Sequence, residues 1–193
     1  MKKLLFLALM LSSAAVLAQS NMRVRGTISS LDGDVLSVKS REGKELKLHL
    51  TPDAQVAVAK KLSLADIKPG TYVGVTSVPQ GGKQVAKEVH LIPPAAPSGH
   101  MDWDLVPGSK MTNANLQAAV AAAGGNEITL KYKDGEKKIV VPPDAPIVKY
   151  VPGNKDELKP GAKIFIVAAV KQPDGPLAAP TVSVGLDGLT PPR

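Results

Sequence analysis

The sequence contains no cysteine and few aromatic residues: Phe, Trp and Tyr make up 3% of its 193 residues. The absence of cysteine excludes disulfides, thiolate metal ligands and a cysteine nucleophile, so a hydrophobic core must stabilise the chain by itself. The sequence also lacks a Gly-x-Ser-x-Gly elbow and a Gly-rich phosphate loop, and it has only three histidines. Because nucleophilic catalysis needs a nucleophile beside an activating base, we expect that the protein is not an enzyme.

The chain also has no apolar run as long as the ~20 residues that a membrane-spanning helix needs, so no membrane span is expected. At its start, Lys2 and Lys3 precede the apolar stretch 4–11, and small residues surround Ala18. This pattern is typical of a secretory signal peptide, here residues 1–18. We expect a periplasmic protein, with secretion as the alternative. Removal of the two lysines leaves 22 of the 24 basic residues against 17 acidic ones, a net charge of +5.

The sequence contains an internal repeat. Residues 68–70 and 159–161 are both Lys-Pro-Gly, and residues 52–54 and 143–145 are both Pro-Asp-Ala. Self-similarity of this kind indicates two copies of one structural module. We expect the following division: signal peptide 1–18, first copy 19–93, Pro-rich linker 94–113, second copy 114–186 and tail 187–193.

Within each copy, apolar and polar residues alternate with the period of a strand. Leu36 and Val38, for example, correspond to Ile128 and Leu130. Hairpin turns are predicted at 41–43 and 133–135, each with a glycine. The pattern of a capping box predicts one short helix after the third strand of each copy, beginning at Ser63 and at Asn154. Three strands, a short helix and two strands is the order of the OB-fold. We expect an all-β protein of two tandem OB-like small β-barrels, each with one short helix; SH3-like barrels are the alternative.

Residues 116–123 carry two opposing signals. Their alanines favour a helix, because alanine is the best helix former. The segment aligned with them in the first copy, residues 24–31, is rich in β-branched residues and is typical of a first strand. We expect a strand at 116–123, because the two copies should share one architecture.

A resemblance to a group of known domains rests on three segments of the second half: residues 111–114, 133–148 ("KDGEKKIVVPPDAPIV") and 158–170 ("LKPGAKIFIVAAV"). The chain resembles small exported β-barrel domains of proteobacteria that are catalogued as a domain of unknown function, here in two tandem copies. Some members of that group carry an automatic label as metal ABC transporter permeases. The resemblance implies the fold and export, but no reaction. A permease needs several membrane spans, which this chain lacks.

The segment Gly99–Met111 gathers unusual side chains between two Pro-rich borders. His100, Met101 and Met111 offer the imidazole and thioether groups that suit Cu(I), so a metal site here is one hypothesis. The alternative is that Trp103 anchors the linker against the barrels, because a tryptophan buries a large apolar area. We prefer the second interpretation for Trp103.

A second possible metal site uses His49 and His90, at outward positions of strands that are neighbours in an OB barrel. Two unrelated exposed histidines are the simpler explanation, because the second copy has Val140 and Ser183 at these positions. Tyr132 lies in the one patch of interleaved basic and aromatic residues, which makes it a candidate ligand or interface residue together with Trp103. Single-strand binders combine a basic groove with stacking aromatics, and export argues against nucleic acid as the partner.

The sequence therefore predicts a non-enzymatic periplasmic binding or accessory protein with no cofactor. The expected partner is a protein of the cell envelope or a small ligand. A periplasmic metal-binding protein, for Cu(I), Ag(I) or a divalent ion, is the alternative.

Overall fold

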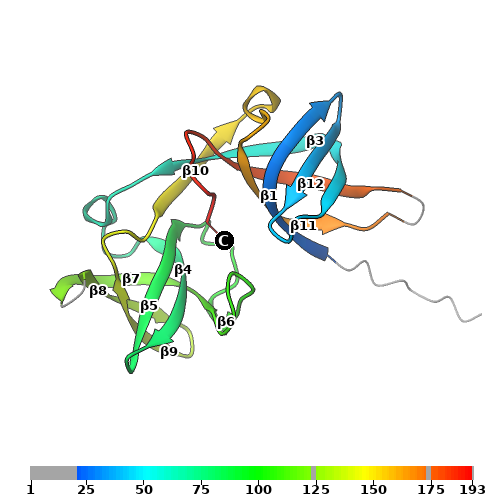
Figure 1. Ribbon diagram of the computed structural model, residues 1–193. Coiled ribbons are helices and arrows are strands. Elements are labelled where there is room, and N and C mark those ends of the chain that lie inside the picture. The colour runs from blue at the N-terminus through cyan, green and yellow to red at the C-terminus, as the bar shows by residue number, and fades with distance from the viewer. Residues whose placement is uncertain (1–20, 123–124, 173–174, 193) are drawn as a thin grey trace, which may run out of the picture.

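The computed structural model describes residues 21–122, 125–172 and 175–192, and it is all-β (Figure 1). The predicted signal peptide and Arg193 lie outside the described residues. Within them, no helix is long and apolar enough to cross a membrane. The described part of the chain forms twelve strands and two 3-10 turns: β1 (Asn21–Asp32), β2 (Val35–Ser40), β3 (Glu45–Lys61), η1 (Leu64–Asp66), β4 (Tyr72–Gln80), β5 (Lys83–Leu91), β6 (Gly99–Asp102), β7 (Lys110–Ala122), β8 (Gly125–Tyr132), β9 (Gly135–Val141), β10 (Ile147–Gly153), η2 (Lys155–Glu157), β11 (Lys163–Val170) and β12 (Leu177–Gly185).

Five strands close into a β-barrel, called here the first barrel. Their order is β12-β11-β1-β2-β3, and β3 returns to β12 through a parallel pairing that runs from Leu48 opposite Leu177 to Ala59 opposite Gly185. The other four pairings are antiparallel. Buried apolar side chains from all five strands fill the core, as the alternating pattern predicts: Val24, Ile28, Leu36, Val38, Leu48, Leu50, Val56, Val58, Ile164, Ile166, Ala169, Ala179, Val182 and Val184.

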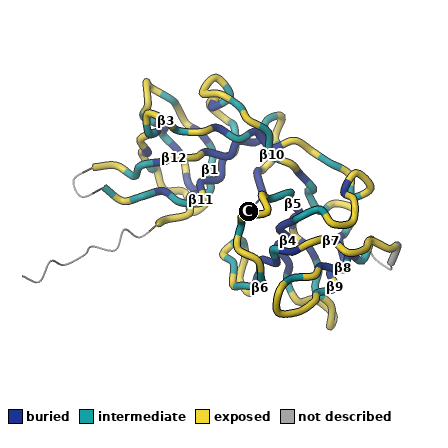
Figure 2. Tube along the Cα trace, turned by 180° about the vertical axis from the view of Figure 1, so that it is seen from behind, coloured by how far each residue is buried: buried dark blue, intermediate teal, exposed yellow. Residues whose placement is uncertain are grey.

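The other strands form the second strand set, in the order β5-β4-β7-β8-β9, with β6 added beside β7. Its first and last strands also meet, through two parallel pairs in which Gln84 lies opposite Ile139 and Val85 opposite Val140. A separate core lies within this set: Ile67, Val73, Val75, Ala86, Val89, Ala114, Leu116, Ile128, Leu130, Ile139 and Val141. Figure 2 shows the buried residues of the two groups as two separate concentrations.

Each group contains strands from both halves of the chain that the sequence predicts to be copies of one module. The first barrel combines β1, β2 and β3 of the first copy with β11 and β12 of the second, and the second strand set combines β4 and β5 with β7, β8 and β9. The strand pairings therefore do not follow the predicted division into one barrel from residues 19–93 and another from residues 114–186. Figure 1 shows β3 and β10 passing side by side from one group to the other.

The register of the β3–β10 pair has the symmetry expected for two copies of one module. In this antiparallel pair, Ala59 lies opposite Tyr150. These two positions are separated by the same number of residues as the two Pro-Asp-Ala motifs, so they are equivalent in the repeat. A residue that faces its own equivalent in an antiparallel pair lies on a two-fold axis, as in a symmetric dimer.

Residues 116–122 lie in strand β7, which confirms the strand expected there; residue 123 lies outside the described residues. The alignment behind that expectation is wrong in register. Leu116 pairs with Leu130 as Ile28 pairs with Val38, so Leu116 is equivalent to Ile28 and not to Val24. The tertiary pairing with β8 overrides the helix preference of alanine, which is only a weak bias for each residue.

Both predicted helix caps are confirmed, each on a single 3-10 turn. The Ser63 hydroxyl accepts a hydrogen bond from the Ala65 N–H at 3.1 Å, and the Asp66 carboxylate accepts one from the Ser63 N–H at 2.9 Å. Asn154 and Glu157 repeat the arrangement. The hairpin turns predicted between the second and third strands of each copy are also present.

Candidate functional site

The segment that includes Gly99–Met111 forms a β-hairpin. Strand β6 pairs antiparallel with the start of β7, and Met101 lies opposite Met111. Ser109 closes the loop: its hydroxyl donates to the Trp103 carbonyl at 2.9 Å, and the Trp103 N–H donates to the Ser109 carbonyl at 3.0 Å. The predicted linker 94–113 therefore contains ordered sheet, and the hairpin holds residues 103–106 at its tip.

The tip of this hairpin contacts the first barrel. An Asp104 carboxylate oxygen lies 3.0 Å from an Arg25 guanidinium nitrogen. Arg41 donates to the carbonyls of Asp104 at 2.9 Å and of Leu105 at 2.8 Å. The Arg23 guanidinium lies 4.0 Å from the centroid of the Trp103 ring, which is a cation-π distance. We call this set of contacts the clasp. These contacts attach the hairpin tip to the first barrel, as the anchoring interpretation of Trp103 predicts.

Electrostatics strengthen the clasp at neutral pH. Burial by itself would raise the pKa of Asp104, but the hydrogen bond from Arg25 and the positive charges of Arg25 and Arg23 lower that pKa overall. Asp104 therefore stabilises the folded state at every pH above its ordinary pKa. This contribution is lost as the pH falls through the lower pKa of the folded protein.

We expect Asp104→Asn to destabilise the protein by about 0.5 to 1 kcal/mol, because exposed ion pairs contribute about that much. The emission of Trp103, the one tryptophan, should shift to the red as the clasp loosens. Urea unfolding at pH 7 and at pH 3 measures both effects, and the difference between variant and wild type should shrink at the lower pH. Asp102→Asn is the matched control, because the side chain of Asp102 is 90% exposed and pairs with Lys110. An equal effect of the two substitutions would contradict the role of the clasp.

The hairpin divides the predicted metal ligands between its two faces. Met101 and Met111 share one face, because they lie directly opposite each other. His100 lies on the other face, since successive strand residues alternate. There its Nδ1 lies 2.9 Å from the Thr112 hydroxyl oxygen. Burial lowers the pKa of His100, and the charge of Lys137 lowers it further, so the ring stays neutral at pH 7.

Met111 is buried, and its sulfur lies 3.8 Å from the Thr76 hydroxyl oxygen. Across the described residues, no group of three or more His, Cys, Asp or Glu side chains gathers where it could hold a metal ion. Metal binding by this hairpin stays a prediction.

The structure does not bring His49 and His90 together, because β10 lies between β3 and β5 in the sheet. His49 is exposed on the first barrel. The expectation that His90 is exposed is wrong, because its side chain is buried, with 2% of its surface accessible. Its ring packs across Gly74, where a Cβ would come within 2.5 Å of the imidazole Nε2. Tyr150 lies edge-on to the same ring, with 6.5 Å between centroids.

Tyr132, the other predicted interface residue, packs against the core of the second strand set. Its hydroxyl lies close to Gly135 in the adjacent hairpin. Lys131 and Lys133 on either side of it are exposed. The structure thus places Tyr132 and Trp103 in different parts of the molecule.

A cavity of about 400 Å³, called here the central cleft, lies between the first barrel and β5. Its walls come from four strands, the hairpin tip and the C-terminal segment: Arg25, Gly26, Thr27, Lys39, Ser40, Arg41, Glu88, Leu105, Lys163, Ile164, Thr190 and Pro191. Glu88 is 4% exposed, and its carboxylate accepts a hydrogen bond from Thr76 at 2.7 Å. The cleft therefore combines apolar walls with a buried acceptor.

Two lysines and a threonine form a row across the first barrel at this cleft. Thr27 of β1 lies opposite Lys39 of β2 on one side and opposite Lys163 of β11 on the other. Directly opposed residues share a face, and neighbouring strands lie about 4.8 Å apart, so the two lysines flank the Thr27 hydroxyl. In the part of the chain that the structure describes, neither lysine has a carboxylate within ion-pairing distance. The row presents two ammonium groups and one hydroxyl to a ligand.

Sequence reasoning missed Glu88, Lys39 and Lys163. Lys39 and Lys163 are ordinary outward residues of alternating strands, and they belong to different copies of the repeat. They meet because β1 pairs with both β2 and β11. Local patterns carry no signal for such a row, since it exists only once the strands of the two copies are combined.

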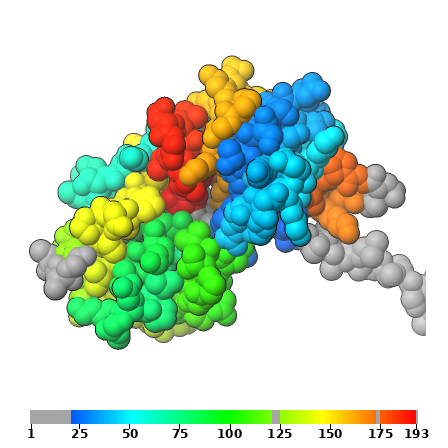
Figure 3. Space-filling model, in the orientation of Figure 1, coloured from blue at the N-terminus to red at the C-terminus, as the bar shows by residue number. Residues whose placement is uncertain are grey.

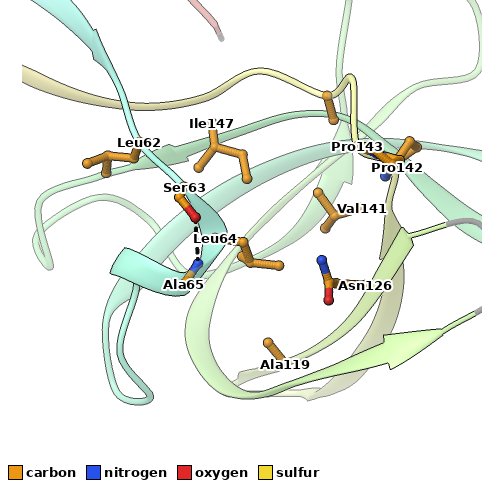
Figure 4. Close-up of a pocket in the computed structure, with 11 residues that line it drawn as sticks. Leu62, Ser63, Leu64, Ala65, Ala119, Asn126, Val141, Pro142, Pro143 and Ile147 are labelled. Carbon is orange, nitrogen blue, oxygen red and sulfur yellow. Dashed lines mark hydrogen bonds between the residues drawn. The ribbon is translucent and has the colours of Figure 1, made fainter.

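A second cavity, of about 560 Å³, lies beside η1 (Figure 4). Leu64, Val141 and Ala119 surround it in that view, and Asn126 contributes a side-chain amide to its lining. The Ser63 hydroxyl at its edge accepts the hydrogen bond of the helix cap. None of the described residues that line it is charged. We take the central cleft as the candidate site, because it combines the lysine row with the apolar residues Leu105 and Pro191.

Comparisons with known proteins found no match among protein-family models, curated proteins or solved structures. The resemblance to exported β-barrel domains stays a prediction.

Proposed function

We propose that this chain is a non-enzymatic periplasmic binding protein whose central cleft takes an organic anion with an apolar body, such as a long-chain carboxylate. The row Lys39–Thr27–Lys163 is the observation that carries the proposal. We also propose that the second strand set is a small barrel like the first and that both are of the OB type. The predicted signal peptide supports export.

The charges at the cleft favour an anion over a cation. Ammonium groups make charge-assisted hydrogen bonds to carboxylates, and these are about twice as strong as neutral ones. Arg25 and Arg41 contact the hairpin tip, whereas Lys39 and Lys163 remain available to a ligand. The anionic group is therefore expected at the lysine row.

The walls of the cleft decide what the rest of the ligand must be. Leu105 and Pro191 give the cavity apolar surfaces, which suit a hydrocarbon body. An amphiphile with one anionic end fits both the lysine row and these apolar walls.

A fluorescent anionic amphiphile, anilinonaphthalene sulfonate, tests the proposal with the mature chain. We expect saturable binding that decanoate displaces and decylamine does not. The double variant Lys39→Gln with Lys163→Gln should weaken binding at least tenfold, because each charged hydrogen bond contributes about 1.5 to 3 kcal/mol. The matched control is Lys131→Gln with Lys133→Gln, which removes two exposed lysines of the second strand set. Equal affinity of both double variants, or no saturable binding, would overturn the proposal.

A further inference from the structure

The C-terminal segment 186–192 folds back after β12 and lies between the first barrel and the second strand set. It turns at Asp187 and Gly188, whose φ angles are 53° and 78°, and the Leu189 N–H donates to the Leu186 carbonyl at 2.9 Å. Pro191 and Pro192 are buried, although no strand pairing holds them. Figure 3 shows this segment, in red, seated between the two groups on the visible face.

The surface that this segment covers, called here the groove beside Tyr150, offers a hydrogen-bond donor and a close approach of two backbones. The Tyr150 hydroxyl donates to the Pro192 carbonyl. Gly185 forms part of the opposite side, where a Cβ would come within 1.9 Å of the Leu189 carbonyl oxygen. Only glycine permits this approach of one backbone to another. The groove is thus fitted to a backbone that lies flat on it and offers carbonyls.

A second Pro-rich segment of the chain is held in the same way. The Tyr72 hydroxyl donates to the Ala96 carbonyl at 3.1 Å, within the sequence Pro93-Pro94-Ala95-Ala96-Pro97. Proline has no N–H and its φ is fixed, so a Pro-rich segment offers carbonyl acceptors and loses little entropy on binding. Aromatic side chains with a polar hydrogen are the usual complement of such segments.

We propose that the groove beside Tyr150 is a docking site for an extended peptide with two consecutive prolines, and that the C-terminal segment occupies it in the free protein. A partner segment of this chemistry displaces residues 187–192. The segment is suited to exchange, because its described residues have no ladder hydrogen bonds to lose. The proposal does not require an anion in the central cleft, although the segment supplies Thr190 and Pro191 to the walls of that cleft.

The experiment uses the mature chain ending at Leu186 and a labelled, amidated peptide of residues 186–192, with binding followed by fluorescence anisotropy. We expect the truncated chain to bind the peptide saturably. The intact chain should bind it at least tenfold more weakly, because its own segment competes at an effective concentration in the millimolar range. Tyr150→Phe in the truncated chain should weaken binding about fivefold, since a neutral hydrogen bond contributes about 1 kcal/mol. A peptide with both prolines replaced by alanine should bind at least tenfold more weakly.

A folded truncated chain that does not bind the peptide would overturn the proposal, and so would equal binding of the alanine peptide. If the truncated chain does not fold, the full-length variant Pro191→Ala with Pro192→Ala replaces it, because this variant keeps the chain length and weakens only its own segment. Peptide affinity no higher than that of the wild type would then overturn the proposal. Anilinonaphthalene sulfonate binding, measured on the intact wild-type chain, shows separately whether the central cleft functions, because Thr190 and Pro191 line that cleft and are absent or changed in the variants.

Discussion

Residues 19–96 and residues 97–192, produced as two separate chains, are expected to remain largely unfolded alone and to form the native structure when mixed. The first half contains β1, β2 and β3 but lacks β11 and β12, which complete the first barrel. The second half lacks β4 and β5. Each half therefore leaves its barrel strands with open edges and an exposed core, and it cannot bury enough apolar surface to offset the entropy of ordering.

Circular dichroism and the Trp103 emission of the second half measure this result. Mixing at equal concentration should restore both signals and a single unfolding transition. The matched control is the intact chain cleaved once between residues 93 and 98, which should stay assembled, because the strands of the two copies are interleaved. Two halves that each unfold cooperatively by themselves would contradict the strand exchange.

Leu36→Ala and Ile128→Ala are expected to lower the free energy of unfolding of the whole protein, and by similar amounts. The two residues occupy equivalent positions of β2 and β8, and both are 0% exposed. Removal of a buried Leu or Ile side chain to alanine costs about 2 to 5 kcal/mol. Because β3 and the paired β10 join the two groups into one sheet, each substitution should lower one common unfolding transition.

Calorimetry with urea denaturation checks this expectation. Val120→Ala is the control, because the Val120 side chain is 56% exposed and its truncation should change the free energy of unfolding by less than about 0.5 kcal/mol. If Leu36→Ala splits the unfolding curve into two steps and leaves one group at its original midpoint, the two groups fold independently and the argument from shared strands is wrong.

Local features of the fold were predictable because neighbouring residues determine them. Alternation of apolar and polar residues predicted which side chains of β2 and β8 enter the cores, and the capping patterns at Ser63 and Asn154 predicted the two short turns. The strand at 116–122 also followed from the repeat. His90 shows the limit of this reasoning: an outward position on a strand predicts exposure only until another part of the chain covers it.

The candidate sites depend on contacts that local patterns do not contain. The lysine row needs β1 between β2 of its own copy and β11 of the other. The groove beside Tyr150 needs the C-terminal segment to reach a strand that lies far from it in the sequence.

The sequence by itself determined the all-β class, the period of the strands, the turns and the repeat, because each depends on residues a few positions apart. The tertiary structure alone decided which copy supplies the closing strands of each group. The third strand of the first copy, β3, runs on for 17 residues, about 55 Å at the rise of a strand. It carries the chain out of the first barrel before β4 begins, so β4 and β5 join strands of the second copy, and β11 and β12 return to close the barrel that the first copy began.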